Sequence, residues 1–256
     1  DRDQDELLYE VVSTLRWESH SGARHVAVPE ASEALVRTFD ERSPPPAPEV
    51  AAPPPGQRLR ARPNISIERP APVSSDDAMA AIRQRLGDCS RCSLHQGRKQ
   101  IVFGQGPTSA SLFIIGVGPG VEEDACGQLW QGEPGALLER MLVAIGLSRA
   151  EVYLASGVMC RPPEPNRPER SSLAACTPFL RSQLEVVAPS VVLVLGETVG
   201  QFLFKTKAPI AELRGSWRDL IGFPTMVSYD PGQLLKDANL KREAWSDLKQ
   251  VKKRLS

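Results

Sequence analysis

The chain has 256 residues, of which 41% are hydrophobic, enough for the core of one domain of ordinary size with appendages. Its 31 basic and 31 acidic residues give a formal net charge of zero, so overall charge neither supports nor opposes a nucleic-acid partner. No apolar stretch reaches the roughly 18 residues that a membrane span requires, which argues against a membrane protein.

The first 75 residues are predicted to lie outside the main domain. Residues 1–42 form an N-terminal helical extension, in which apolar residues recur at helical spacing: Leu7, Leu8, Val11, Val12 and Leu15. This amphipathic helix either packs on the main domain or binds a partner. Residues 43–75 are rich in proline and poor in large apolar residues, a composition that predicts an extended, disordered linker.

Residues 76–256 are predicted to form one compact domain in which strands and helices alternate. A helix is expected to begin near Ser75, where Ser-Asp-Asp precedes an apolar pattern. Short apolar runs predict strands at residues 111–116, 152–158, 191–195 and 225–228. Helices are expected at residues 134–145, 173–187 (broken near Pro178), 197–204 and 240–255. This alternation predicts a parallel sheet covered on both faces, with ligand sites at the carboxyl ends of its strands.

Four of the five cysteines have a spacing typical of metal ligands. Cys89 and Cys92 form a C-x2-C pair, and Cys160 and Cys176 follow much later in the chain. Thiolates in this arrangement bind an iron–sulfur cluster or, as the weaker alternative, a tetrahedral zinc ion. Ordinary buried thiols remain an alternative without metal, and Cys126 is not expected to be a ligand. An odd cysteine count and no recognisable secretory signal disfavour disulfides and predict a reducing, cytoplasmic environment.

Three loops at predicted strand ends could carry chemistry. The first is the glycine-rich segment 116–120, which is followed by the acidic run 122–124. Its glycines would let the backbone approach a ligand closely, although a plain tight turn explains them equally well. The other two loops are residues 155–157 and 228–232. Spacing alone therefore predicts a metal-stapled α/β domain with a small-molecule or nucleotide site.

The sequence resembles the iron–sulfur class of uracil-DNA glycosylases, often called family 4, from Cys89 to Leu255. The matching fragments occur in order: CSRCSL, VFGQG, GVGPGVEED, GALLERMLVAIGL, EVYLASGVMCRPP, AACTPFL, VVLVLG, LRG, YDPGQLLK and LKREAWSDLK. The resemblance implies a three-layer α/β/α domain and a 4Fe-4S cluster on the four cysteines named above. It also implies a DNA-binding face at which a deaminated base is flipped into a pocket, because the glycosidic carbon is unreachable inside the stack.

Carried over residue by residue, the resemblance indicates an altered site. Val117 stands where the family has a glutamate, beside Gly118, whose backbone belongs to the base-binding loop. Glu123 and Asp124 remain as candidates to hold a catalytic water. An aromatic residue stacks on the flipped base in the family, and Trp130 fills that place.

Two residues that read the uracil in the family also differ. Ser156 stands where a family asparagine reads the uracil edge, and one hydroxyl cannot replace the paired donor and acceptor of an amide. Asp230 stands where the family's His-Pro motif has its histidine. An ionised carboxylate only accepts hydrogen bonds and would repel the oxyanion that develops on uracil. Asp230 could instead act as a base, act as a neutral donor if burial raises its pKa, or simply cap the following helix.

Two interpretations follow. The first is an active DNA glycosylase with altered base preference; the second is a catalytically silent relative that binds DNA or protein. In either case the expected partner is single- or double-stranded DNA, with a repair or replication protein possible through residues 1–75. A monomer without membrane contact is expected. Candidate phosphate contacts are Arg161, Arg167, Lys236, Lys241 and Arg242, and Leu234 or Leu235 could enter DNA as a wedge.

Overall fold

The computed structural model describes residues 74–163 and 166–256. By its internal contacts the chain divides into two units, Asp1–Pro72 and Val73–Ser256, and the fold below is that of the second unit. The predicted N-terminal helix, and the predicted linker up to residue 73, lie outside the described residues. Among the described residues, no helix is long and apolar enough to cross a membrane.

Five strands form one sheet in the order β2-β1-β3-β5-β4. Their bounds are β1 Leu112–Gly116, β2 Tyr153–Ser156, β3 Val191–Leu195, β4 Trp217–Leu220 and β5 Phe223–Ser228. The first three strands and β5 run parallel, and β4 pairs antiparallel with β5 at one edge. The chain moves from β1 to β2 on one side and then returns to β3 on the other side of β1. The carboxyl ends of β1 and β3 therefore form a switch point, where open α/β sheets bind ligands.

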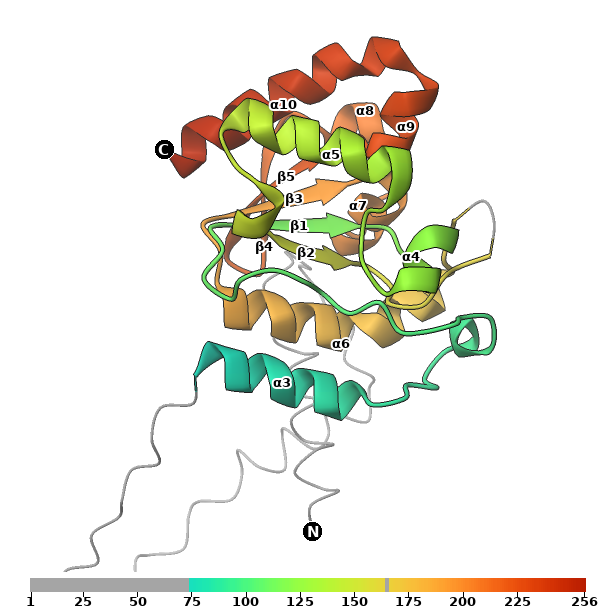
Figure 1. The fold of residues 1–256 in the computed structure, drawn as a ribbon. Coiled ribbons are helices and arrows are strands. Elements are labelled where there is room, and N and C mark those ends of the chain that lie inside the picture. Colours follow the sequence, from blue (N-terminus) through green and yellow to red (C-terminus); the bar gives the residue numbers. More distant parts are fainter. Residues whose placement is uncertain (1–73, 164–165) are drawn as a thin grey trace, which may run out of the picture. The chain divides into compact units, whose positions relative to one another are not determined.

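Helices cover both faces of this sheet and complete three layers (Figure 1). On one face lie α5 (Gly132–Ile145), α9 (Pro231–Lys236) and α10 (Lys241–Leu255). On the other lie α6 (Arg170–Val187) and α7 (Glu197–Leu203), with α3 (Ser75–Leu86) packed on the outside of α6. The remaining short elements are α4 Val121–Cys126, α8 Ile210–Leu213, η1 Ser93–Gln96, η2 Arg149–Glu151 and η3 Ala238–Leu240. The predicted three-layer α/β/α architecture is confirmed.

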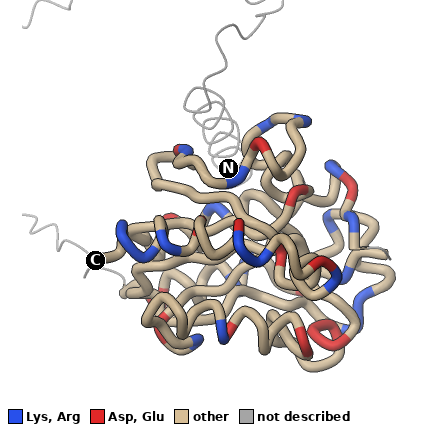
Figure 2. The backbone as a smooth tube through the Cα atoms, turned by 90° about the horizontal axis from the view of Figure 1, so that it is seen from above, with Lys and Arg blue, Asp and Glu red and all other residues tan. Residues whose placement is uncertain are grey.

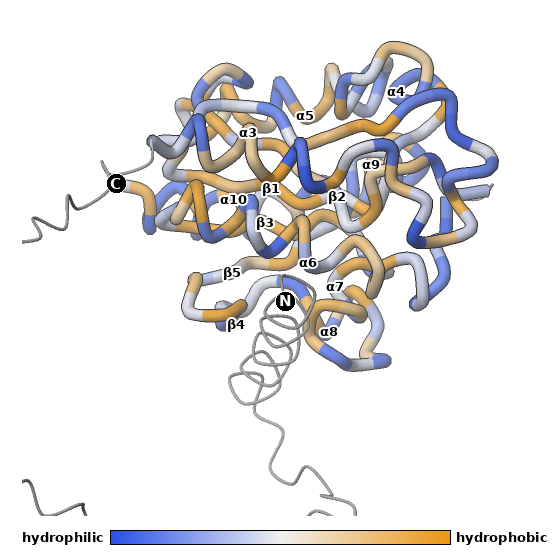
Figure 3. The backbone as a smooth tube through the Cα atoms, turned by 90° about the horizontal axis from the view of Figure 1, so that it is seen from below, coloured by the Kyte–Doolittle hydropathy of each residue, from blue (hydrophilic) through white to orange (hydrophobic). Residues whose placement is uncertain are grey.

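The apolar strands explain why the sheet is the centre of the domain. Every residue of β1 and β3 is buried, and these strands are among the most hydrophobic parts of the chain in Figure 3. Such uniformly apolar runs are stable only when both faces of the sheet are covered. The free edge of β2 is protected because Gln105 exchanges two backbone hydrogen bonds with Leu154.

Local signals set the helix ends as predicted in two cases. The side chain of Ser74 accepts a hydrogen bond from the Asp77 backbone N–H and caps α3. Helix α5 carries Pro134 in its first turn and ends at Gly146, whose φ of 86° is the left-handed conformation that glycine adopts readily.

Two expectations were wrong. Helix α6 runs unbroken through Pro178, because Phe179 and Leu180 after the proline and Leu173 before it are all buried, and this packing outweighs the cost of a missing hydrogen bond, about 3 kcal/mol. Strand β4 was not expected because its sequence, WRDL, has no run of apolar residues. It forms a hairpin with β5 through Ile221 and Gly222, both at positive φ.

Candidate active site

A cavity of about 560 Å³ opens at the switch point of the sheet. Its walls come from the loops that follow β1, β2, β3 and β5, together with the start of α5. The predicted base-site residues that line it are Val117, Gly118, Glu123, Trp130, Ser156 and Asp230. Segments far apart in the sequence thus meet at one place, as expected for the carboxyl edge of a doubly wound sheet.

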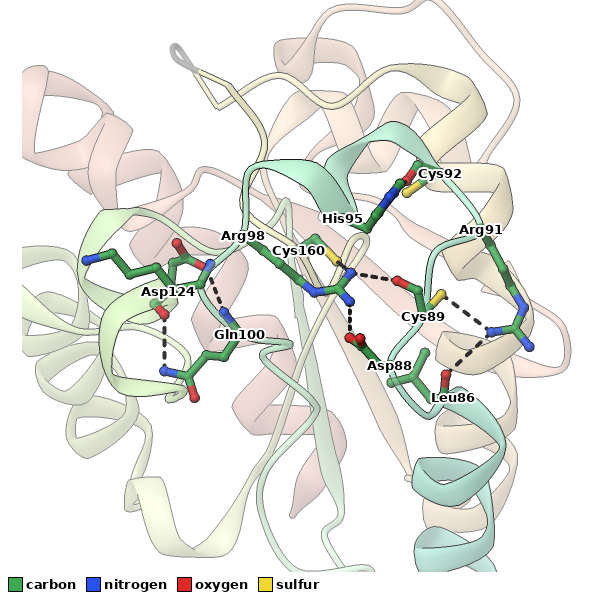
Figure 4. A network of polar contacts seen from close by, with 11 residues as sticks. Leu86, Asp88, Cys89, Arg91, Cys92, His95, Arg98, Gln100, Asp124 and Cys160 are labelled. Carbon is green, nitrogen blue, oxygen red and sulfur yellow. Dashed lines mark hydrogen bonds and ion pairs between the residues drawn. The ribbon is translucent and has the colours of Figure 1, made fainter.

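Asp124 is not among the residues that line this cavity. It is fully buried, and its Oδ1 accepts a hydrogen bond from the Lys99 backbone N–H at 2.8 Å. Its Oδ2 lies 3.8 Å from the Arg161 guanidinium. Figure 4 shows Asp124 beside Gln100, whose side chain donates to the Asp124 carbonyl. These contacts give Asp124 a structural role, tying α4 to the segment after η1.

Glu123 faces the cavity, but both of its carboxylate oxygens accept backbone hydrogen bonds. Oε2 accepts from Gly120 N at 2.9 Å, so the side chain of Glu123 satisfies the backbone N–H of the N-cap residue of α4. Oε1 accepts from Gln131 N at 3.1 Å. The carboxylate therefore fixes two loops of the cavity wall.

The indole of Trp130 forms one wall. A Cβ placed on Gly116 would lie 2.6 Å from Cζ2 of Trp130, so the ring packs directly against the backbone at the end of β1. Trp130 has a φ of 49°, and the Arg149 guanidinium donates to its carbonyl at 3.1 Å. This strained backbone is held in place by its surroundings, and the buried indole contributes to the cavity lining.

Val117 and Ser156 form another part of the wall, in which Val117 contributes an apolar side chain and Ser156 contributes a hydrogen-bond acceptor. The Ser156 hydroxyl donates to the Val158 carbonyl at 2.7 Å and is buried. Because a hydroxyl has a single proton, the Ser156 oxygen can only accept further hydrogen bonds. The Val117 carbonyl accepts from Val158 N, and a Cβ on Gly196 would lie 3.2 Å from Cγ2 of Val117, so this side chain fills the space beside β3.

Asp230 caps α9, as the simplest interpretation of its sequence position predicts. Its Oδ1 accepts from Gly232 N at 2.8 Å, and Pro231 occupies the first helical turn. Burial raises the pKa of Asp230 above its ordinary value, and the negative charge of Glu123 raises it further. The backbone N–H groups of the helix and the charge of Lys236 oppose this shift. Capping does not exclude a second role, because Asp230 also lines the cavity.

A buried polar network supports the end of β5, and the sequence analysis did not predict it. Arg214 donates to both carboxylate oxygens of Asp247, at 2.6 and 3.0 Å. Asp247 is fully buried and also accepts from the Ser228 hydroxyl at 2.6 Å. Tyr229 donates to Glu243, which is 3.3 Å from Arg214. Arg214 belongs to the fragment LRG and Asp247 to LKREAWSDLK, so the two fragments meet beneath the loop that carries Asp230.

The four predicted ligand cysteines lie in one part of the structure. Cys160 and Cys176 share a buried apolar cluster against which Cys92 packs. Burial raises the pKa of both thiols, that of Cys176 to about 12, and the charges of Cys89 and Cys92 raise both pKa values further. No group of three or more Cys, His, Asp or Glu side chains among the described residues has the arrangement that holds a single metal ion.

Two guanidinium groups accompany these thiols (Figure 4). Arg98 donates to Cys160 Sγ at 3.3 Å and to the Cys89 carbonyl at 2.6 Å, and its side chain is only 8% exposed. Arg91 donates to Cys89 Sγ at 3.4 Å. Positive charge close to sulfur favours the thiolate form, the form that binds metals.

The surface around the cavity offers cations for phosphates. Arg167 and Lys236 both line the cavity and are exposed, while Leu234 is buried and Leu235 is 38% exposed. Figure 2 shows basic and acidic residues interspersed along the backbone of the described residues rather than divided into two halves. Any DNA contact would therefore depend on local cations.

The fold and the site together define an α/β protein with a pocket of about 560 Å³ at its switch point. Residues 103–249 match the family described as the uracil DNA glycosylase superfamily. The chain is 33% identical over 181 residues to the Type-4 uracil-DNA glycosylase of Thermotoga maritima, covering 69% of this chain and 94% of that protein. It is also 33% identical over 190 residues to the Type-4 uracil-DNA glycosylase of Saccharolobus solfataricus, covering 70% and 88% of the two chains. The chain belongs to the uracil DNA glycosylase superfamily.

Proposed function

We propose that this protein is a DNA glycosylase of base excision repair, with uracil specificity weakened or altered. The observation that carries the proposal is the cavity at the switch point, which brings together five separated segments at the positions where the family binds its flipped base. Its relatives are named Type-4 uracil-DNA glycosylases. Glycosylases act on an extruded base, and a cavity of about 560 Å³ has room for one.

The roles of individual residues follow from their placement. Trp130 stacks on the base, and the backbone of Gly118 with Val117 forms the opposite wall. Asp230 contacts the base or the sugar, because its carboxylate lines the cavity. Glu123 lies close enough to hold a water, whereas Asp124 acts through the fold, since its carboxylate is turned toward Lys99 and Gln100.

The pocket is a poor match for uracil. Uracil needs donors for its two carbonyl oxygens, and the proton of Ser156 is already given to Val158. Losing one well-placed donor to a developing oxyanion costs about 10²–10³ in rate. A carboxylate at position 230 adds repulsion, so little uracil excision by the usual route is expected.

One observation favours a second function, that of a catalytically silent DNA- or protein-binding module in repair or replication. Ser156 and both oxygens of Glu123 are engaged with the backbone, so these side chains already have structural partners. A silent module would keep the fold and the DNA-binding surface, and could recruit a partner through residues 1–75.

The donor set fits a 4Fe-4S cluster on Cys89, Cys92, Cys160 and Cys176. Each thiolate of such a cluster binds a different iron atom, so the four sulfurs need not converge on one point as they would around a single zinc ion. Arg98 and Arg91 would stabilise the thiolates. The cluster would act as a clamp, joining the segment after α3 to the segment after β2 and to α6. We further propose a monomeric protein in the cytoplasm.

The test is excision of uracil from a single-stranded oligonucleotide, with abasic sites cleaved afterwards by alkali. We expect the protein to leave uracil in place and to bind the strand. The triple substitution V117E, S156N and D230H should restore some cleavage, because it returns the family's side chains to the cavity. A triple variant that binds DNA but does not cleave would support the silent module instead.

A further inference from the structure

Several polar side chains of the cavity present hydrogen-bond acceptors, beside the donors that Thr198, Gln233, Arg167 and Lys236 bring to the lining. Ser156 has given its proton to Val158, and Asp230 and Glu123 are carboxylates. Asn166 also lines the cavity: its amide nitrogen faces the Gly118 carbonyl at 3.4 Å, while its buried Oδ1 has no hydrogen-bond partner among the described residues. A fifth acceptor is Glu197, which lines the cavity and uses Oε2 for the Ile210 backbone N–H.

These carboxylates are also not neutralised by ion pairs. Within residues 74–163 and 166–256, none of the ion pairs involves Asp230, Glu123 or Glu197. The two cations of the lining, Arg167 and Lys236, have exposed side chains and lie at the rim, whereas the three carboxylates are partly buried. The interior of the cavity is therefore negative and its rim positive.

We propose that this cavity takes a base that carries a positive charge and hydrogen-bond donors, the chemical class formed when a ring nitrogen of cytosine, adenine or guanine is alkylated. The inference rests on the proposed glycosylase function and names its substrate class. A cation in the cavity would be attracted by Asp230 and Glu123, and its amino group would meet Ser156 and Asn166. Trp130 would stack on it, because an indole face attracts cations more strongly than any other aromatic ring does.

The charges that develop as the glycosidic bond breaks also favour a cationic base as the substrate. When uracil leaves, the glycosidic electron pair makes it an anion, which the carboxylates of Asp230 and Glu123 would repel. When a cationic base leaves, the same electron pair passes from the C1′–N bond to the ring nitrogen and makes the base neutral. Positive charge then moves to the sugar, where the carboxylates of Asp230 and Glu123 would stabilise it. Water adds its oxygen to C1′ and releases one proton to the solvent.

The phosphates of the flipped nucleotide would meet the positive rim. Arg167 and Lys236 are suitably exposed for this, since phosphate contacts are made by flexible surface cations.

The experiment compares three single-stranded oligonucleotides of the same sequence, each with one modified position: 3-methylcytosine, 5-methylcytosine or uracil. The two methylcytosines have the same number of atoms in their ring and methyl group, but only the first is cationic at neutral pH. Base released by the full chain is measured by mass spectrometry, with a reaction lacking protein as the blank. We expect release of 3-methylcytosine at least about tenfold faster than release of either neutral base.

A substitution at Asp230 can remove the charge of its side chain and keep its role as a helix cap. Asp230→Asn should lower release of 3-methylcytosine about tenfold or more, since it removes the charge, while its amide oxygen can still accept from Gly232. Asp219→Asn is the matched control: Asp219 caps the turn before β5 by accepting from Gly222 N at 2.9 Å, at the end of the strand away from the cavity. It should release base as the parent does.

The outcomes are distinct. Release of uracil or another neutral base at the rate of 3-methylcytosine or faster would overturn the inference and leave the glycosylase function standing. Release of no base of any kind, by protein that binds DNA, would overturn both. Equal release by Asp230→Asn and the parent would overturn the assigned role of the carboxylate.

Discussion

The cysteine region and the cavity differ in whether their negatively charged groups have cations beside them. Near the cysteines, Arg98 and Arg91 donate to sulfur, so thiolates in that region are compensated by one buried side chain, Arg98, and one exposed residue, Arg91. In the pocket, Asp230 and Glu123 lie without an ion-pair partner among the described residues. The first region suits an anionic group that stays, such as a cluster held by four thiolates. The second suits a positive charge that arrives with a substrate and leaves as the reaction proceeds.

The largest expected effect comes from breaking the ion pair of a buried carboxylate, Asp247, which lies next to the pocket. Asp247 is fully buried and has its cation, Arg214, which also contacts Glu243. Arg214→Met should lower the free energy of unfolding by about 3–5 kcal/mol, because it leaves Asp247 buried and unpaired. Urea denaturation would measure the loss. Adding Asp247→Asn should recover part of it, and a double variant no more stable than the single one would contradict this explanation.

The next largest effect is expected from replacing one of the four cysteines proposed to bind the cluster. Cys160→Ser should lower the free energy of unfolding by about 3 kcal/mol or more and abolish the brown colour of the purified protein, because a lost ligand removes the cluster and the folding energy it provides. Denaturant unfolding and the visible absorption spectrum check this together. Cys126→Ser is the control, since Cys126 is exposed and lies outside the group of four. A colourless parent protein would show that no iron–sulfur cluster is bound.

Stacking in the pocket is expected to matter somewhat less. Trp130→Ala should lower the rate of release of a cationic base by about tenfold, the range found when one aromatic–base stack is removed. Trp130→Phe should retain more of the rate, because it keeps an aromatic face. The control is Trp245→Ala, since Trp245 lies on α10 and is absent from the cavity lining. Equal losses for the two tryptophans would indicate a general effect on folding rather than stacking.

The sequence could predict elements that their own residue pattern determines, but not elements or contacts that depend on partners distant in the chain. The strands around LFIIG and VVLVL could be predicted because a run of buried apolar residues has few alternatives in an alternating α/β pattern. A site at the carboxyl ends of the strands followed from the alternating pattern, whereas the strand order that creates the switch point, and that brings Trp130, Ser156 and Asp230 to one cavity, came from the structure. Strand β4 could not be predicted, because pairing with β5 and not its own sequence makes it a strand.

The sequence also could not predict which groups the polar side chains bind. Asp124 and Glu123 are neighbours in one acidic run, yet one turns to Lys99 and the other to Gly120 and the cavity. Which way each points depends on the helical turn of α4 and on segments distant in sequence. The use of the Ser156 proton by Val158 likewise follows from the backbone geometry after β2 and from no local motif.

The smallest effect distinguishes a functional Asp230 from a plain helix cap. Burial, with Glu123 nearby, raises the pKa of Asp230 in the folded chain, while Lys236 and the amides of α9 lower it less. The folded state therefore holds this proton more tightly than the unfolded state, and stability falls as the pH rises from the ordinary aspartate range through the raised pKa. Where the carboxylate is ionised in the folded chain its burial is a cost, so Asp230→Asn should raise the free energy of unfolding, and this gain should shrink as the pH falls. Urea titrations at several pH values would measure the difference. An ordinary cap would lose stability or show no pH-dependent gain, whereas a stabilised variant that releases less base identifies a carboxylate kept for its chemistry at the expense of the fold.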